Sequence, residues 1–130
     1  MTIYPNDDFP QCEQHGKAFV RVCKSSDLVQ KQGICVEFNE YSQIAVFRVD
    51  DALYAVSNIC PHNHMPLLHK GFVNTEACSI TCPMHGWEYS LRTGQNVASS
   101  HSRLHVYEVF ESNGWVYLEK PQTHEPAWVW

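Results

Sequence analysis

Long hydrophobic runs are missing from this 130-residue chain. The apolar stretches are short, as at 44–47, and far below the roughly 20 residues that cross a bilayer, so we expect no membrane-spanning segment. The first residues lack a basic region followed by an apolar one, so we expect no secretory signal and a cytoplasmic location. Basic residues are also few. Nine Lys and Arg against 14 Asp and Glu leave a net charge of −5, which argues against nucleic acid and anionic membranes as partners.

Gly-rich nucleotide-binding loops, internal repeats and long helical periodicity are absent as well. Without the signature of a substrate site, we do not expect this chain to catalyse a reaction alone. The length fits one domain. We divide it into an irregular lead-in at 1–16, a main domain at 17–120 and an extended, loosely held tail at 121–130. In the tail, Trp128 and Trp130 either pack back on the domain or form a contact surface.

The chain does contain short apolar runs separated by turn signals. Ser25-Ser26-Asp27 is expected to cap a single helical turn, in a segment that Gly33 ends, and Asn113-Gly114 is a strong hairpin signal. Because both alternating sets of residues in 42–49 are apolar, that strand should be covered on both faces. The pattern predicts an all-β fold with a two-loop insertion at about 57–95. The expected strands are 17–23, 34–38, 42–49, 52–56, 77–81, 87–91, 104–110 and 115–118.

Two segments carry one Cys and one His each: Cys60-Pro61-His62 and Cys82-Pro83-Met84-His85-Gly86-Trp87. Two thiolates and two imidazoles are what a Rieske-type [2Fe–2S] cluster requires, with both Cys on one iron and both His on the other. Each pair is split between the segments, so the two loops must meet in space. Zinc is the alternative for this ligand set, although C-x-H is short for a zinc pair. A catalytic Cys–His pair would leave the second pair unexplained.

The remaining four cysteines are expected to be thiols rather than disulfides, as is usual in a reducing cytosol. Cys23 and Cys35 fall within expected strands, where Cys behaves as a small apolar residue. The four are Cys12, Cys23, Cys35 and Cys78.

Residues 17–120 resemble the Rieske ferredoxin family, including its branch that forms the small subunit of NAD(P)H-dependent nitrite reductase. The resemblance lies in the two Cys–His segments and in Leu91-Arg92-Thr93-Gly94; segments 44–49 and 53–58 resemble the nitrite reductase branch in particular. It implies an antiparallel β-sandwich of three sheets with a small two-loop cluster-binding subdomain. In that subdomain one [2Fe–2S] cluster would be held by Cys60 and Cys82 on the inner iron and by His62 and His85 on the outer iron.

The same resemblance implies a one-electron carrier whose partner is another redox protein: a reductase, an oxygenase or a nitrite reductase large subunit. A nitrite reductase small subunit is the first interpretation. The alternatives are a free-standing ferredoxin of a ring-hydroxylating oxygenase and a structural zinc-binding module. The chain lacks the mononuclear iron domain of a full Rieske oxygenase.

The chain departs from the high-potential members of the family at the two loops. Met65 and Met84 stand where those members carry bridging cysteines, so that disulfide is absent. Trp87 replaces a Ser that donates to a cluster sulfur. Tyr89, however, falls where those members have a hydrogen-bonding Tyr, and we therefore expect Tyr89 to raise the midpoint potential modestly.

His64, Met84, Trp87 and Tyr89 are the expected neighbours of the cluster. His64 is either a docking or proton-coupled group or a loop histidine in solvent. The apolar segment 65–68 and Trp87 either form a rim for a partner or pack the two loops together. The family's third loop over the cluster, usually Pro-containing, corresponds to 97–101, so the cover of the cluster is expected to be looser.

Overall fold

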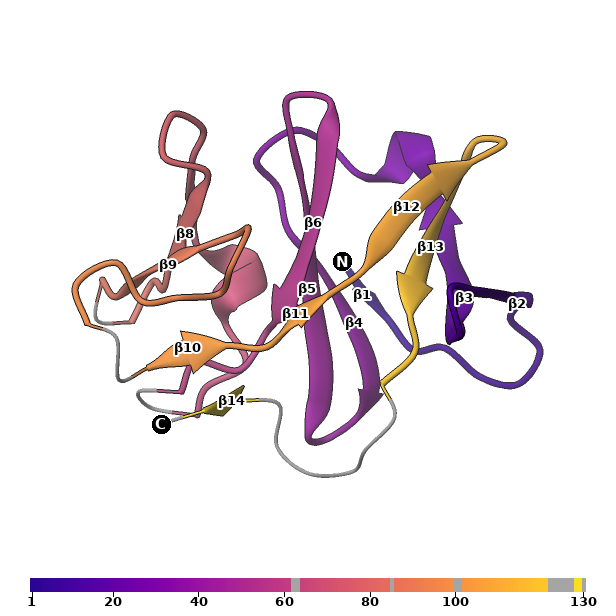
Figure 1. Ribbon diagram of the computed structural model, residues 1–130, viewed down its shortest axis with the longest axis horizontal. Helices are drawn as coiled ribbons and strands as arrows, with labels where there is room; N and C mark the ends of the chain where they lie inside the picture. Colours follow the sequence, from indigo (N-terminus) through magenta and orange to yellow (C-terminus); the bar gives the residue numbers. More distant parts are fainter. Residues whose placement is uncertain (62–63, 85, 100–101, 122–127, 130) are drawn as a thin grey trace.

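The computed structural model of the chain describes residues 1–61, 64–84, 86–99, 102–121 and 128–129. Three β-sheets lie side by side, with a five-stranded sheet in the middle (Figure 1). Every strand pair is antiparallel except the short β1–β4 pair, which confirms the expected all-β antiparallel class. Within these ranges there is no helix long and apolar enough to cross a membrane.

The middle sheet has the order β1-β4-β5-β6-β11, and a four-stranded sheet on one side has the order β12-β13-β3-β2. On the other side lie the three-stranded sheet β7-β8-β9 and the small pair β10-β14 (Figure 1). The strands are β1 Thr2–Ile3, β2 Gln11–Gln14, β3 Lys17–Lys24, β4 Ile34–Asn39, β5 Ser42–Val49, β6 Ala52–Ser57, β7 Phe72–Asn74, β8 Ser79–Thr81, β9 Glu88–Ser90, β10 Arg103–Leu104, β11 Val106–Tyr107, β12 Val109–Ser112, β13 Trp115–Glu119 and β14 Trp128–Val129; two 3₁₀ turns are η1 Ser25–Asp27 and η2 Leu68–Lys70.

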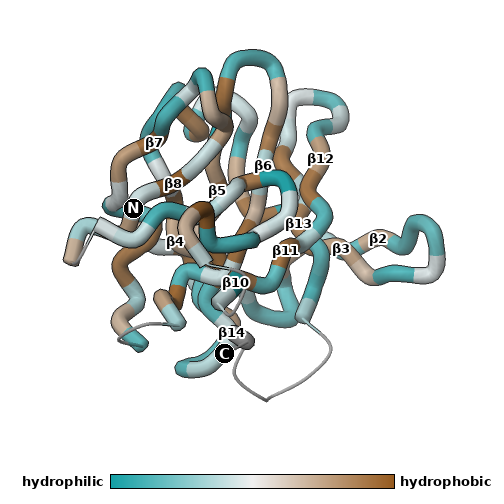
Figure 2. Tube along the Cα trace, turned by 60° about the vertical axis from the view of Figure 1, so that its left-hand side comes forward, coloured by the Kyte–Doolittle hydropathy of each residue, from teal (hydrophilic) through white to brown (hydrophobic). Residues whose placement is uncertain are grey.

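Strand β5 separates two hydrophobic cores and contributes side chains to both. Ile44 and Val46 point into the core shared with the four-stranded sheet. Ala45 and Phe47 point the other way, into the core beneath the three-stranded sheet. All four are at most 1% exposed, which confirms that this strand is covered on both faces. The apolar stretches accordingly follow the central strands, and the hydrophilic ones lie in the connecting loops (Figure 2).

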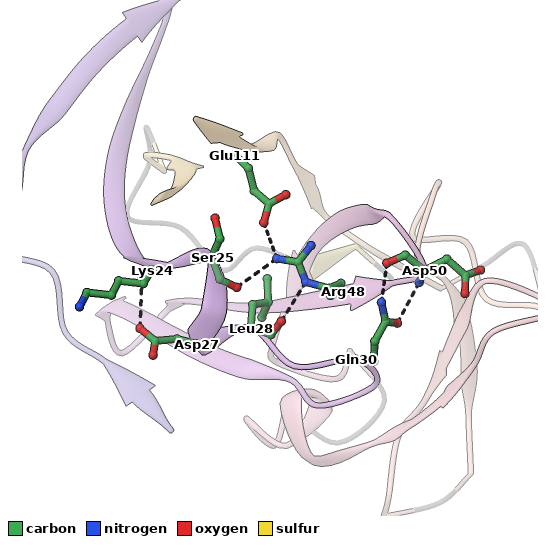
Figure 3. Close-up of polar contacts among 8 residues, drawn as sticks. All are labelled: Lys24, Ser25, Asp27, Leu28, Gln30, Arg48, Asp50 and Glu111. Atoms are coloured by element: carbon green, nitrogen blue, oxygen red, sulfur yellow. Dashed lines mark hydrogen bonds and ion pairs between the residues drawn. The ribbon is translucent and has the colours of Figure 1, made fainter. Parts of the chain in front are cut away.

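A polar network ties the segment after β3 to the end of β5 (Figure 3). The Arg48 Nε donates to the carbonyl of Leu28 at 2.9 Å, and its Nη2 donates to the carbonyl of Ser25 at 3.1 Å and pairs with the Glu111 carboxylate. Just after the end of β5, the Asp50 N–H donates to Gln30 Oε1 at 2.9 Å. These contacts give the irregular segment hydrogen-bond partners on β5 and in the turn that follows it.

Most expected strands are present, but three parts of the chain differ from expectation. The expected strand at 104–110 is broken into β10, β11 and β12, because these pieces pair with three different strands: β14, β6 and β13. The lead-in at 1–16 contains β1 and β2 rather than being irregular throughout. In the tail, which was expected to be loosely held, Trp128–Val129 form β14 and pair with β10.

The structure explains why the Leu91-Arg92-Thr93-Gly94 turn ends in glycine. Its φ is +78°, and a Cβ at this position would lie 2.0 Å from the carbonyl oxygen of Leu104. The Leu104 N–H in turn donates to the Gly94 carbonyl at 2.8 Å, so β10 is seated directly on this turn.

Replacing Gly94 by Ala is expected to lower the free energy of unfolding by roughly 3 kcal/mol, because backbone strain and a backbone clash add. Gly16 is the matched control, since its φ is +79° and nothing lies within 4 Å of its Cβ position. Gly16→Ala should cost only about 1 kcal/mol. Chemical denaturation of both variants measures the difference; equal losses would mean that the close approach of β10 has no energetic weight.

Candidate metal centre

The two Cys–His loops are positioned by the ends of strands. Loop 1 (residues 58–67) follows β6, and loop 2 (residues 82–87) joins β8 to β9. In loop 1 the Cys60 N–H donates to the Met65 carbonyl at 3.1 Å, and the Cys60 carbonyl accepts the His64 N–H at 2.7 Å. These two bonds fold the backbone tightly around Cys60.

Loop 2 repeats this arrangement. The Cys82 N–H donates to the Trp87 carbonyl at 2.8 Å, and the Cys82 carbonyl accepts the Gly86 N–H at 3.0 Å. In both loops the residue four positions after the Cys has a positive φ: +58° at His64 and +74° at Gly86. The same turn therefore surrounds each cysteine, although the two loops share little sequence.

The loops differ in where their histidines fall. His62 is two positions after its Cys, whereas His85 is three positions after, and both histidines lie outside the described residues. Over the rest of the chain, no three His, Cys, Asp or Glu side chains gather as a metal site. The predicted ligand set therefore stays a prediction, for the two cysteines as well as for the two imidazoles.

Both loop cysteines are buried in the same core. Cys60 is 0% and Cys82 1% exposed, and they share the core with Leu68, Ile80 and Leu91. Thiolates are soft donors suited to iron in a sulfide cluster or to zinc. Two buried sulfur donors on two matching turns fit the inner side of a [2Fe–2S] cluster.

The other cysteines are structural, as expected. Among the described residues, which include all six cysteines, there is no disulfide. Burial raises the pKa of the Cys23 and Cys35 thiols to about 11, so both remain protonated at neutral pH and are poor metal ligands.

Tyr89 lies beside the first cysteine. Its hydroxyl is 3.7 Å from Cys60 Sγ and 3.4 Å from Ser102 Oγ, and the side chain is fully buried. Burial raises the pKa of Tyr89 to about 12, so the phenol stays neutral and keeps a proton to donate. The arrangement is compatible with the predicted effect of Tyr89 on the potential.

The remaining expected neighbours lie at the surface near the loops. Met65 and Met84 are 41% and 49% exposed, and His64 is exposed. Trp87 is half-buried against the core that holds the cysteines. It also lines a pocket of about 280 Å³ with residues 96–99 of the third loop.

The third loop is held by a buried asparagine. Asn96 Oδ1 accepts the N–H groups of Ala98 at 2.8 Å and Ser99 at 3.0 Å. Asn96 is 6% exposed. The last two residues of this expected loop, 100–101, lie outside the described residues.

Asn58 is a site residue that the sequence patterns did not single out. It is fully buried at the start of loop 1, two positions before Cys60, and its side chain contacts Pro66 and His69, close to and just beyond the other end of the loop. A polar residue within Ser57-Asn58-Ile59-Cys60, where the strand pattern runs into the ligand motif, is the signal that could have drawn attention to it.

Comparison with known proteins agrees with this site. The family described as "Rieske-like [2Fe-2S] domain" matches residues 18–119. The cholesterol 7-desaturase nvd of Hemicentrotus pulcherrimus is 29% identical over 97% of this chain, and the chain spans only 26% of the length of that desaturase.

Two solved structures have the same fold. A complex of reduced oxygenase and oxidised ferredoxin in carbazole 1,9a-dioxygenase contains a chain with a TM-score of 0.71 and 30% identity, covering 82% of this chain and 97% of the other. A nitrite reductase small subunit from Mycobacterium tuberculosis has a TM-score of 0.74 at 20% identity, covering 88% of this chain and 99% of the other. With the family match, the paired loops and the three-sheet fold in agreement, the chain belongs to the Rieske-like [2Fe-2S] domain family and is a Rieske-type electron-transfer domain.

Proposed function

We propose that this chain transfers single electrons by means of one [2Fe–2S] cluster held by Cys60, Cys82, His62 and His85. The observation that carries the proposal is the pair of matching turns, each of which buries one cysteine in the same core. A single structural zinc ion would not need two such turns with one Cys and one His in each.

The cluster, when bound, supplies reversible one-electron chemistry. The protein contributes the ligands and their surroundings. Buried Cys60 and Cys82 keep water from the sulfur side, and His62 and His85 are neutral donors that raise the potential relative to four thiolates. The Tyr89 hydroxyl lies 3.7 Å from Cys60 Sγ, where a hydrogen bond to sulfur favours the reduced state.

The EPR spectrum of the anaerobically purified, dithionite-reduced protein tests this proposal. We expect a [2Fe–2S] signal with the low average g value that mixed Cys and His ligation produces, together with about two iron atoms per chain. An EPR-silent protein with one zinc per chain and no iron would contradict the proposal and favour a structural metal site.

Replacing Tyr89 by Phe is expected to lower the midpoint potential by about 40 mV, because a net hydrogen bond of about 1 kcal/mol has this size for one electron. Tyr107→Phe is the control, since Tyr107 is a buried tyrosine of the other core and its pKa is also raised by burial to about 12. Redox titration of both variants gives the comparison. An unchanged potential in Tyr89→Phe would mean that the phenol does not act on the cluster.

For the partner, we propose a terminal oxygenase as the first candidate. The supporting observation is the chain from the carbazole dioxygenase complex, which is 30% identical to this chain and is matched over 97% of its own length. A nitrite reductase large subunit is the second candidate, supported by the segments at 44–49 and 53–58 that resemble that branch and by the likeness of fold to its small subunit.

The neighbouring genes decide which component to test. The reduced carrier is mixed in a stopped-flow instrument with the oxygenase or large nitrite reductase subunit encoded beside it, and reoxidation is followed by absorbance. Saturable reoxidation by an oxygenase supports the first candidate. Reoxidation only by a nitrite reductase subunit, or stable co-purification with it, supports the second.

A further inference from the structure

The side chain of Asn58 uses its whole hydrogen-bonding capacity inside the protein. Its Nδ2 donates to the Pro66 carbonyl at 2.9 Å and lies 3.5 Å from Cys35 Sγ. Its Oδ1 accepts the His69 backbone N–H at 2.6 Å and lies 3.0 Å from His69 Nδ1. The residue is 0% exposed, so bulk solvent does not reach these contacts.

The partners determine the orientation of this carboxamide. The Pro66 carbonyl can only accept and the His69 backbone N–H can only donate, so the nitrogen must face Pro66 and the oxygen must face His69. The oxygen then requires a proton on His69 Nδ1. Burial lowers the pKa of His69, which keeps the imidazole neutral with that single proton.

These contacts close loop 1 at its base. Asn58 stands before Cys60, and Pro66 and His69 stand after the loop's ligand residues. The backbone of Asn58 adds to the closure, since its carbonyl accepts the Leu68 N–H at 3.2 Å. One residue thus joins both ends of the segment that contains Cys60 and His62.

The same residue anchors the loop to the middle sheet. The Asn58 N–H donates to the Gln43 carbonyl on β5 at 2.7 Å. Cys35 on β4 accepts from Asn58 Nδ2, and its thiol lies 3.8 Å from Gln43 Oε1, to which it can donate. The loop is therefore bonded to β4 and β5, two neighbouring strands of the middle sheet.

We propose that Asn58 is a positioning residue for the electron-transfer centre, which holds loop 1 in the geometry that keeps Cys60 and His62 on the cluster. The inference rests on the proposed function, because it concerns the same ligands. No disulfide restrains the two loops, since all six cysteines are free thiols in the part of the chain that the structure describes. The carboxamide contacts take over the restraint of loop 1.

The test compares Asn58→Ala, Asn58→Asp and His69→Phe with Asn39→Ala. Asn58→Asp keeps the acceptors for His69 but loses both donors, and His69→Phe removes one side-chain contact while retaining the backbone bond. Asn39 is the matched control because its Oδ1 also accepts two backbone N–H groups, from Tyr41 at 2.8 Å and Ser42 at 3.0 Å, in a turn between β4 and β5. The measurements are the rate of cluster loss to an iron chelator, the midpoint potential, the EPR g values and the unfolding temperature of the apoprotein.

We expect Asn58→Ala to lose its cluster at least about tenfold faster than wild type. Its midpoint potential should differ from that of the wild type, and its EPR features should be broader. His69→Phe and Asn58→Asp should change in the same direction by less. Asn39→Ala should lower the unfolding temperature while its cluster properties stay as in wild type. If Asn58→Ala does not fold, the two milder variants decide the matter.

Wild-type chelation rates and potentials in Asn58→Asp and His69→Phe would overturn the positioning role while leaving the proposed function intact. The positioning role would also be overturned if all Asn58 variants changed only the unfolding temperature, as the Asn39 control is expected to do. Wild-type protein that binds no iron at all would instead overturn the proposed function and this role with it.

Discussion

Cys82→Ser is expected to purify without a [2Fe–2S] cluster, whereas Cys78→Ser is expected to keep it. A serine hydroxyl is a hard, weakly acidic donor and a poor substitute for a thiolate that binds iron in a sulfide cluster. Under the proposed ligand set, Cys82→Ser removes one of the two protein sulfur ligands of one iron, and the iron content should fall to near zero. Iron and sulfide analysis, with the visible absorbance of the purified protein, measures the outcome.

Cys78 makes this comparison a fair one. It is 3% exposed, lies in the same core as Cys82 and is only four positions away in the chain. Serine at either position buries a hydroxyl at a similar cost in stability, roughly 1–3 kcal/mol. A cluster retained in Cys82→Ser, or lost equally in Cys78→Ser, would contradict the assignment of Cys82 as a ligand.

Phe47→Ala should produce a large loss of stability. Phe47 is fully buried on the face of β5 that supports the core with Cys60 and Cys82. Truncating such a side chain costs about 3–5 kcal/mol through lost burial and the cavity left behind. Because a domain of this size is stable by only about 5–15 kcal/mol, the variant should be close to unfolding at 37 °C.

Phe110→Ala provides the reference for the loss of a phenyl ring. Phe110 is half-buried and packs on Phe19 and Tyr117, with ring centroids 5.0 and 5.1 Å apart. Urea denaturation of the apoproteins should show a clearly smaller loss than for Phe47→Ala. If Phe47→Ala lost less than about 1 kcal/mol, the core beneath the cysteines would have to be loosely packed.

The strands that could be predicted from the sequence are those with their own apolar pattern. Strands β3, β4, β5, β6 and β13 were expected within one residue of each observed end. Strand β2 was missed because it is an edge strand of four residues, three of them exposed, and so has no alternating pattern. Strands β1 and β14 have two residues each, and their existence depends on distant partners that no local pattern reveals.

The site shows the same division between local and distant information. The spacing of Cys and His identified the two loops, because metal ligands need particular residue types at short separations. The repeated turn, with a positive φ at His64 as well as at Gly86, could not be predicted, since only a small minority of His residues adopt that conformation. Asn58 was missed because its partners are eight or more residues away in the chain.

The two apolar faces of β5 have a consequence for how the chain finds its native pairing. Side chains alternate along a strand, so a slip of one residue exchanges the two faces. In β5 such a slip would swap Ile44 and Val46 with Ala45 and Phe47 and would expose neither set to water. Hydrophobicity therefore discriminates poorly between the native alignment and its neighbours.

The polar residues near the ends of β5 favour the native alignment over alignments shifted by one residue. Arg48 reaches the carbonyls of Leu28 and Ser25 only from one face, and a slipped strand would turn it into a core. Gln43, next to the Cys35 thiol, would be displaced in the same way. The guanidinium network of Figure 3 thus disfavours misaligned strand pairings during folding. Replacing Arg48 with an apolar residue would therefore make the native alignment less unique, even if the native state itself lost little stability.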